Sequence, residues 1–364
     1  MRVACKRSKE SSSTHLLNRH PSRIAVVGAG AFGRNHLRVW RALENSGSPV
    51  RLVGLVEPDI SLAANLAAEY RLPVYASTGE LLSSQSPPDA ASVAVPTSLH
   101  ASVASQLLAA GVDVLVEKPF TTTIQQADDL LDLAQRHNRI LQVGHLERFN
   151  PAVRAVYPLL RHPLFFEVHR LSVFTPRALD VDVVLDLMIH DLDIVLSWTQ
   201  SPIRDLRAVG LPVLSSKVDI ANVRIEFESG CVANFTASRV STERIRKIRF
   251  FQPHQYISID YARQDVLCID VPAMQPPAAV PPATAPPSAH FQRSEQTHPT
   301  AEFALRKLVI PPGEPLHLEL ESFLLAVRNR TEPQVSGHDG RAALAVALDI
   351  NTAILAHHAR TGLV

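Results

Sequence analysis

Side chains that are spaced for acid–base chemistry stand in the run VDVVLDLMIHDLDIVLSW, residues 181–198. On a helix, Asp186, His190, Asp193 and Ser197 fall within one narrow stripe, and most of the other side chains are apolar. Asp186 and His190 are an i, i+4 pair, so the carboxylate can orient the imidazole and stabilise its protonated form, as a general base requires. The alternative is an amphipathic helix whose acidic stripe faces water.

A lysine ends a second apolar run. The segment VDVLVEKP, residues 112–119, closes with Glu117, Lys118 and Pro119. Most lysines are solvated surface charges, and that is the alternative interpretation of Lys118. At the end of a buried strand, its ammonium would instead hold a hydroxyl group and stabilise a forming alkoxide. The sequence does not decide whether the peptide bond before Pro119 is cis or trans.

The elements that must position these residues begin with a glycine-rich turn. Residues 24–33, IAVVGAGAFG, are a buried-strand run that leads into G-x-G-x-x-G. Gly28 allows the tight turn, Gly30 lets the backbone approach a pyrophosphate, and Gly33 lets the next helix pack on the strand. The following strand-like run ends at Glu57, whose carboxylate would bind ribose hydroxyls and repel a 2′-phosphate. The sequence therefore predicts NAD rather than NADP, with a Rossmann-like unit that binds no nucleotide as the alternative.

Two domains are predicted from the pattern of elements. Strands alternate with helices over residues 23–145, which predicts an α/β Rossmann domain with a parallel sheet. Residues 146–364 contain short alternating strands separated by turns, which predicts an α+β domain with an open, mainly antiparallel sheet. Helices are expected near residues 316–330 and 340–357.

Two segments are left out of this fold. Residues 1–22 are polar and show no periodicity, so we expect a disordered extension. Residues 272–289 form a proline-alanine tract that can neither pair in a sheet nor hold a helix, so we expect a mobile surface loop.

A single crevice should collect the chemistry. In a parallel sheet, ligands bind at the carboxyl ends of the strands. Pro96, Lys118 and residues 144–148 all follow predicted strands. We therefore expect them to border one crevice together with the glycine loop.

The composition sets outer limits on function. The 364 residues, 46% hydrophobic and 20% charged, are ordinary for a soluble globular protein of two domains. A formal charge of +1 gives no reason to expect nucleic acid or an anionic membrane as a partner. No apolar stretch approaches the length of a membrane span, and the N-terminal segment lacks the apolar core of a secretory signal. We expect a cytoplasmic protein.

The cysteines and acids do not predict a metal site. Cys5, Cys231 and Cys268 are widely separated and form no C-x-x-C pair, which argues against a disulfide framework or a zinc site and fits a reducing compartment. A metal held by His190 and the acids of its helix would need a further ligand, and none is apparent.

Taken together, these motifs resemble the Gfo/Idh/MocA oxidoreductases. The resemblance is carried by GAGAFG, the acid at Glu57, VPTSLH with Pro96 and His100, VLVEKP, and D-x-x-x-H-x-x-D, and it covers nearly everything from Arg23 to the C-terminus. It implies tightly held NAD(P), hydride transfer at a sugar or cyclitol carbon, and a mixed-sheet second domain used for oligomerisation, as a homodimer or homotetramer. The residues expected to bind the cofactor are Gly28, Gly30, Ala31, Phe32, Gly33, Glu57, Pro96, His100, Glu117 and Lys118.

The same resemblance assigns catalytic roles. It maps the family's lysine onto Lys118, its histidine onto His190 and the preceding aspartate onto Asp186. As a hypothesis, His190 removes a hydroxyl proton, Asp186 supports the imidazolium and Lys118 stabilises charge on the oxygen, or the lysine and histidine exchange roles. One departure is Met188, where the family frequently has glycine.

Two longer segments resemble a narrower group. VGHLERFNPAV, residues 143–153, and VVLDLMIHDLDIVL, residues 183–196, are similar to the bacterial UDP-N-acetylglucosamine 3-dehydrogenases of diamino-sugar lipid A synthesis. That resemblance implies oxidation of the 3-hydroxyl of a nucleotide sugar to a ketone, which a separate aminotransferase would aminate. The expected substrate contacts are Arg148, Asn150, Arg177 and Asp193. Cations available for a diphosphate also include Arg239, Arg244, Arg246, Lys247 and Arg249, most of which alternate as a solvent-facing strand would.

Two other functions stay open at this point. One is the same chemistry on another sugar or cyclitol, such as an inositol, because substrate pockets vary on a shared fold. The other is a catalytically silent NAD-sensing regulator. Retention of both Lys118 and His190 argues against the regulator.

Overall fold

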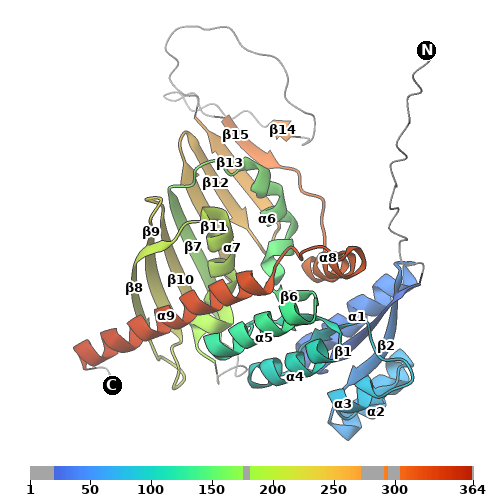
Figure 1. Ribbon diagram of the computed structural model, residues 1–364. Coiled ribbons are helices and arrows are strands. Elements are labelled where there is room, and N and C mark those ends of the chain that lie inside the picture. The colour runs from blue at the N-terminus through green and yellow to red at the C-terminus, as the bar shows by residue number, and fades with distance from the viewer. Residues whose placement is uncertain (1–19, 175–180, 272–290, 294–303, 363–364) are drawn as a thin grey trace, which may run out of the picture.

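The computed structural model describes residues 20–174, 181–271, 291–293 and 304–362 (Figure 1). Two sheets organise the chain, one of six strands and one of nine. Arg177, the segment 272–289 and most of the predicted N-terminal extension lie outside the described residues.

The first sheet is fully parallel and runs in the order β3-β2-β1-β4-β5-β6. The predicted Rossmann sheet is confirmed. The strand order reverses between β1 and β4, and the carboxyl ends of these neighbouring strands open the crevice where such sheets bind ligands. The strands are β1 (Ser22–Val27), β2 (Val50–Val56), β3 (Val74–Tyr75), β4 (Ala90–Val93), β5 (Asp113–Glu117) and β6 (Leu141–Gly144).

Helices cover both faces of this sheet, because its strands are buried on both sides. On one face, Leu37 and Trp40 of α1 share a core with Leu320 and Phe323 of α8, a helix from near the C-terminus. On the other face, α4, α5 and part of α9 close a second core. The first five helices are α1 (Ala31–Asn45), α2 (Ile60–Tyr70), α3 (Thr78–Leu82), α4 (Thr97–Ala109) and α5 (Ile124–Arg136).

The second sheet is mixed, in the order β14-β15-β13-β12-β11-β7-β10-β9-β8. Its neighbours pair antiparallel, apart from the central strands β7 and β10, which run parallel. The mainly antiparallel sheet is therefore confirmed, although β8, β14 and β15 were not among the predicted strands. The strands are β7 (Phe165–Val173), β8 (Ile203–Leu211), β9 (Ile220–Phe227), β10 (Val232–Ser241), β11 (Ile245–Gln252), β12 (Gln255–Asp260), β13 (Asp265–Asp270), β14 (Phe291–Arg293) and β15 (Ala304–Leu308).

Helical elements of the second half lie between the sheets and across them (Figure 1). Helices were predicted near residues 316–330 and 340–357, and α8 and α9 confirm them. The elements are η1 (Leu146–Phe149), α6 (Pro151–Val156), η2 (Tyr157–Leu159), the π-helical turn η3 (Val184–Met188), α7 (Ile189–Thr199), α8 (Pro315–Asn329) and α9 (Gly337–Thr361).

Among the described helices, α9 alone has the length and apolar composition to cross a membrane. It packs against α5, α7 and β8 instead, as the core helix of a folded domain does. Its length and composition are therefore weak evidence for a membrane span.

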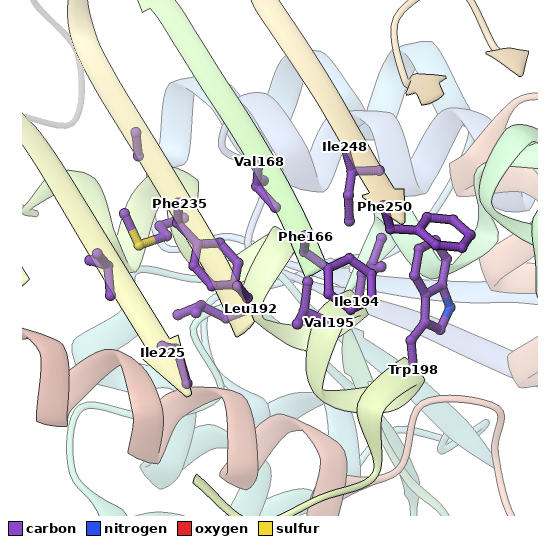
Figure 2. Packing of buried hydrophobic residues seen from close by; sticks show 14 of the residues in the cluster. Phe166, Val168, Leu192, Ile194, Val195, Trp198, Ile225, Phe235, Ile248 and Phe250 are labelled. Atoms are coloured by element: carbon purple, nitrogen blue, oxygen red, sulfur yellow. The ribbon is translucent and has the colours of Figure 1, made fainter. Parts of the chain in front are cut away.

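The helix α7 packs against one face of the nine-stranded sheet (Figure 2). Trp198 lies 5.5 Å from Phe250 and 6.2 Å from Phe166 between ring centroids, and Leu192 and Val195 fill the space beside them. Burying side chains of this size contributes roughly 1.5–3 kcal/mol each. This packing fixes α7, and with it His190, against the sheet.

A buried ion cluster ties α7 to the central strand of this sheet. Arg170 on β7 donates from Nε to the Asp191 carboxylate at 2.6 Å and from Nη1 to Glu147 at 3.1 Å. Its guanidinium also lies 5.3 Å from the centroid of the Tyr261 ring. Although burial opposes the charged form, the two carboxylates raise the pKa of Arg170 above its ordinary value. Removing any one of these buried charges would therefore leave its partners buried without a counter-charge, which is strongly unfavourable.

We predict that Arg170→Met destabilises the protein by about 3–5 kcal/mol, because it leaves two buried carboxylates without their cation. The matched control is Arg249→Met on the neighbouring strand β11, whose ion pair with Glu167 spans 3.5 Å and is partly exposed. That control should cost less than about 1 kcal/mol. Urea unfolding measures both, and equal losses in the two variants would contradict the role of the cluster.

Candidate functional site

The site is a cavity of about 860 Å³ at the carboxyl ends of β4 and β5, where the parallel sheet meets η3 and α7. Phe32, Pro96 and Lys118 line it from the six-stranded part, and Asp186 and His190 line it from η3 and α7. Gly144, Leu146 and Glu147 also border it, as the predicted crevice requires, but Arg148 does not. The structure thus brings the three predicted catalytic side chains to one cavity.

The glycine loop has the shape that a dinucleotide phosphate needs. Gly28 has φ +92°, and a Cβ there would lie 2.7 Å from the Ala94 carbonyl oxygen. A Cβ on Gly33 would lie 2.0 Å from the Gly28 oxygen, so this position must be glycine for α1 to pack on the turn. A Cβ on Gly30 would meet nothing within 4 Å. That free side is where a phosphate can approach the backbone.

The start of α1 and the nearby acid fit the rest of such a ligand. No side chain caps the N-terminus of α1, so the N–H groups of Ala31 and Phe32 remain directed out of the helix end. Glu57 accepts a hydrogen bond from the Ala29 N–H at 3.0 Å through one carboxylate oxygen and from the Asp59 N–H at 3.0 Å through the other. The acid is held beside the glycine loop, as a ribose ligand requires. We conclude that these residues fit NAD.

His100 and Pro96 shape the loop after β4. Pro96 precedes the first residue of α4 and lines the cavity. Both ring nitrogens of His100 face backbone carbonyl oxygens, of Pro119 at 2.9 Å and of Val95 at 2.9 Å. Burial lowers the pKa of His100, so it is neutral and donates to one of these oxygens at a time. Its nitrogens tie two loops together, and its predicted contact with the cofactor stays a prediction.

A second histidine, which the sequence did not single out, holds Glu117. His36 on α1 is fully buried and its Nε2 lies 2.9 Å from the Glu117 carboxylate. A Cβ on Gly144 would lie 2.7 Å from the same carboxylate, so the strand β6 leaves room for it. Glu117 borders the cavity in this fixed position. The sequence feature that could have identified His36 is its position about one turn into the helix that follows the glycine loop.

Lys118 is held by the π-helical turn. Its Nζ donates to the Asp186 carbonyl oxygen at 2.7 Å and to the Asp186 carboxylate at 3.2 Å. The peptide bond between Lys118 and Pro119 is cis. A π turn leaves a carbonyl free of the regular helical pattern, and such turns are frequent at functional sites. The ammonium is therefore aimed into the cavity by one residue from the other sheet's domain.

The environment of His190 corrects one expectation. The Asp186 carboxylate has Lys118 as its partner, and the Nδ1 atom of His190 has no hydrogen-bond partner in the described chain. Burial, followed by the positive charges of Lys118 and Arg170, lowers the pKa of His190 well below 6.5. Asp186 therefore does not support an imidazolium. It holds the cation instead, and the imidazole of His190 is neutral near pH 7.

Three expected substrate contacts lie away from the cavity. Arg148 donates to both Asp193 oxygens, at 2.7 and 3.1 Å, and Asp193 is buried. Asn150 is also buried, donates to Glu147 and the Tyr261 carbonyl, and caps α6. None of the three lines the cavity. Because the polar atoms of each residue form hydrogen bonds within the protein, we revise their role from substrate contact to structural support.

Besides Lys118 and Arg170, the cations that reach the cavity are Arg246 and Lys217. Arg246 is exposed at the start of β11 and Lys217 lies in the loop before β9, and neither side chain has an ion-pair partner among the described residues. Of the other candidates, Arg239 is buried against Asp219, whereas Lys247 and Arg249 pair with Asp260 and Glu167. The sequence missed Lys217, because it stands alone in a polar loop.

Metal and thiol chemistry have no centre in the described parts of the chain. There, no group of three or more His, Cys, Asp or Glu side chains is arranged to hold a metal ion. Cys231 and Cys268 are free and buried, and burial raises the pKa of each thiol to about 11. Both are inert as nucleophiles near neutral pH.

Comparisons with known proteins place this geometry in a family. Residues 22–145 match the model described as "Oxidoreductase family, NAD-binding Rossmann fold", and residues 154–252 match the GFO/IDH/MocA C-terminal domain. The chain is 34% identical over 334 residues to the UDP-N-acetylglucosamine 3-dehydrogenase of Acidithiobacillus ferrooxidans, which covers 91% of this chain and 97% of that protein. An inositol 2-dehydrogenase of Acidothermus cellulolyticus is 30% identical over 51% of this chain and 56% of its own length.

Solved structures show the same architecture. The Acidithiobacillus ferrooxidans enzyme superimposes with a TM-score of 0.79 at 32% identity, covering 92% of this chain and 98% of that one. The WlbA dehydrogenase of Bordetella pertussis, solved with NADH and UDP-GlcNAcA, has a TM-score of 0.72 at 15% identity over 93% of this chain and 98% of its own. At that identity the second likeness concerns the fold alone.

We predict that Gly30→Ala weakens NAD binding at least about tenfold, or about 1.4 kcal/mol, and leaves the fold intact. The new methyl group meets no protein atom within 4 Å, so it acts only on a ligand at the loop. Calorimetric titration measures the affinity. The matched control is Gly79→Ala in α3, where the nearest atom to a Cβ is 3.9 Å away. Unchanged affinity in Gly30→Ala would contradict the placement of the phosphates.

Proposed function

The chain belongs to the Gfo/Idh/MocA oxidoreductase family, and from this we propose that it is an NAD-dependent dehydrogenase that oxidises the 3-hydroxyl of UDP-N-acetylglucosamine. The observation that carries the proposal is the meeting of Lys118, Asp186 and His190 at one cavity beside the glycine loop. The near full-length similarity to an enzyme named for that substrate supports the choice of sugar.

Two side chains share the proposed chemistry: His190 as a neutral base and Lys118 as a fixed cation. Bound NAD supplies a hydride acceptor for the carbinol carbon. His190 is neutral, because burial and nearby cations lower its pKa, so it can accept the hydroxyl proton. Lys118 is held by the Asp186 carboxylate at 3.2 Å and borders the cavity, where its ammonium can donate to the oxygen as negative charge develops. The geometry therefore favours His190 as the base over the exchanged assignment.

Two cations that line the same cavity suit a diphosphate. Arg246 and Lys217 have no carboxylate partners in the described chain, whereas Arg170, which also lines the cavity, is already neutralised by Asp191 and Glu147. Partly exposed guanidinium and ammonium groups are the usual ligands of phosphate oxygens. A free sugar or a cyclitol has no group that would use them.

We further propose that the keto nucleotide sugar serves diamino-sugar lipid A synthesis, in which a separate aminotransferase would aminate it, and that the enzyme works in the cytoplasm. We also propose that it assembles as a homodimer or homotetramer through the nine-stranded sheet. The family resemblance supports these steps.

The direct test is incubation of the purified protein with UDP-N-acetylglucosamine and NAD, followed by absorbance of NADH. We expect turnover, and we expect Lys118→Met and His190→Asn each to lower kcat at least about 100-fold, because each removes a group that acts on the reacting oxygen. NAD affinity, measured by calorimetry, should stay within about twofold. Oxidation of an inositol instead of the nucleotide sugar would overturn the substrate assignment, and full activity of both variants would overturn the catalytic one.

A second prediction concerns recognition of the diphosphate. Arg246→Gln should raise KM for UDP-N-acetylglucosamine by about tenfold to a hundredfold, because it removes a charge-assisted hydrogen bond to phosphate. The matched control is Arg249→Gln, on the same strand but paired with Glu167 and away from the cavity. Steady-state kinetics at varied sugar concentration measure both variants. An unchanged KM in Arg246→Gln would remove this residue from the substrate site.

A further inference from the structure

A second buried imidazole lies behind His190 and takes no part in the mechanism above. His145 stands between β6 and η1, is 1% exposed, and has no hydrogen-bond partner at either ring nitrogen in the described chain. The Nδ1 atom of His190 is buried and unpartnered as well. Leaving such groups unpaired costs roughly 1–3 kcal/mol each, so a histidine is an expensive choice at this position unless its nitrogens are used.

The two rings lie next to each other, one edge toward the other's face. Their centroids are 6.5 Å apart and their planes stand at 89°. One bridging water between the ring edges would carry a proton across this separation. His190 lines the cavity and His145 does not, so the two stand in series, from substrate to interior.

The two rings differ in how strongly their surroundings disfavour a proton. Burial, followed by Lys118, Arg170 and Arg246, lowers the pKa of His190 well below 6.5. Burial also lowers the pKa of His145, as do Arg148 and Lys118, but the carboxylates of Asp193 and Glu117 oppose that shift. Glu319 on α8 is fully buried as well, and burial together with Glu117 and Asp193 raises its pKa well above the ordinary value, so that it is uncharged. A proton is therefore less disfavoured on the second ring than on the first.

We propose that His145 is a relay residue, which receives the substrate's proton from His190 during oxidation. The substrate O–H bond breaks as an N–H bond forms at the cavity side of His190, and the Nδ1 proton of His190 passes to a nitrogen of His145. The electron pair of the carbinol C–H bond leaves as hydride to NAD, as in the proposed function on which this inference rests. His190 is thereby returned to its neutral form while the proton remains inside the protein.

The first test needs no variant. The turnover rate of the wild-type protein is measured in mixtures of H₂O and D₂O, with whichever alcohol it oxidises. Two protons in motion give a plot of rate against deuterium fraction that bows downward, and we expect this result. A straight plot, which indicates one proton, would overturn the relay. Oxidation of a cyclitol but not of the nucleotide sugar would overturn the proposed substrate alone.

The second test is His145→Asn, with His358→Asn as the matched control. His358 on α9 is also buried, donates from Nε2 to the Gly210 carbonyl oxygen, and does not line the cavity. We expect kcat to fall at least about tenfold in His145→Asn with KM and NAD affinity unchanged, and the control to stay within about twofold. Added imidazole should restore part of the rate in His145→Gly.

The pH profile separates a relay from a structural role. In the wild type His190 is a base with a pKa below 6.5, so the rate holds below pH 6.5 and is lost only as the pH falls through that lowered pKa. In His145→Asn the proton stays on His190, and the acid side of the kcat profile should move to higher pH. A variant that folds, keeps the wild-type profile and shows no imidazole rescue would contradict the proposal. If it does not fold, the plot in H₂O and D₂O decides.

Discussion

The site depends on one contact between the halves of the chain, the bond of Lys118 to Asp186. Lys118 ends a strand of the parallel sheet, and Asp186 lies in the π-helical turn that leads into α7. Through this contact the amine is held by a carbonyl and a carboxylate of the same residue, and the imidazole of His190 follows one turn later on the same helical element. The relative position of the two groups is therefore set by a single short segment. A pair held in this way needs little rearrangement when a hydroxyl enters between them.

Two further ion pairs fix how α7 is turned about its own axis. Asp191 and Asp193 follow His190 on α7 and are both buried, which a helix tolerates only when each acid is paired. Asp191 pairs with Arg170 of strand β7, and Asp193 pairs with Arg148 of η1. The apolar residues beside these acids, Leu192, Ile194 and Val195, pack on the sheet (Figure 2). Because the acids are anchored to different elements, the rotation of α7 is fixed with His190 directed to the cavity.

The positions of the residues at strand ends were predictable from local sequence, whereas strand β8 and the long-range pairings of charged side chains were not. Gly28, Glu57 and Lys118 stand at strand ends whose patterns are strong, so their place along the carboxyl edge of the parallel sheet followed from the rule for such sheets, and of the three Lys118 lines the cavity. The strand β8 escaped prediction because Gly210 and Ala208 face inward there, where small residues make room for α9, and its alternation is weak. The partners of Arg148 and Glu117 were not predicted from the sequence either. Those pairings join elements far apart in the chain, and no local pattern encodes which carboxylate meets which cation.

In the proposed mechanism, an amine from one sheet's domain and an imidazole from the other act on one hydroxyl group. The most direct measurement is a crystal structure with NAD and UDP-N-acetylglucosamine bound, in which the distances from the sugar 3-oxygen to Lys118 Nζ and to His190 are read. We expect both nitrogens to lie within about 3.2 Å of that oxygen. A complex in which the 3-oxygen touches neither group, or in which the sugar lies outside the cavity between them, would contradict it.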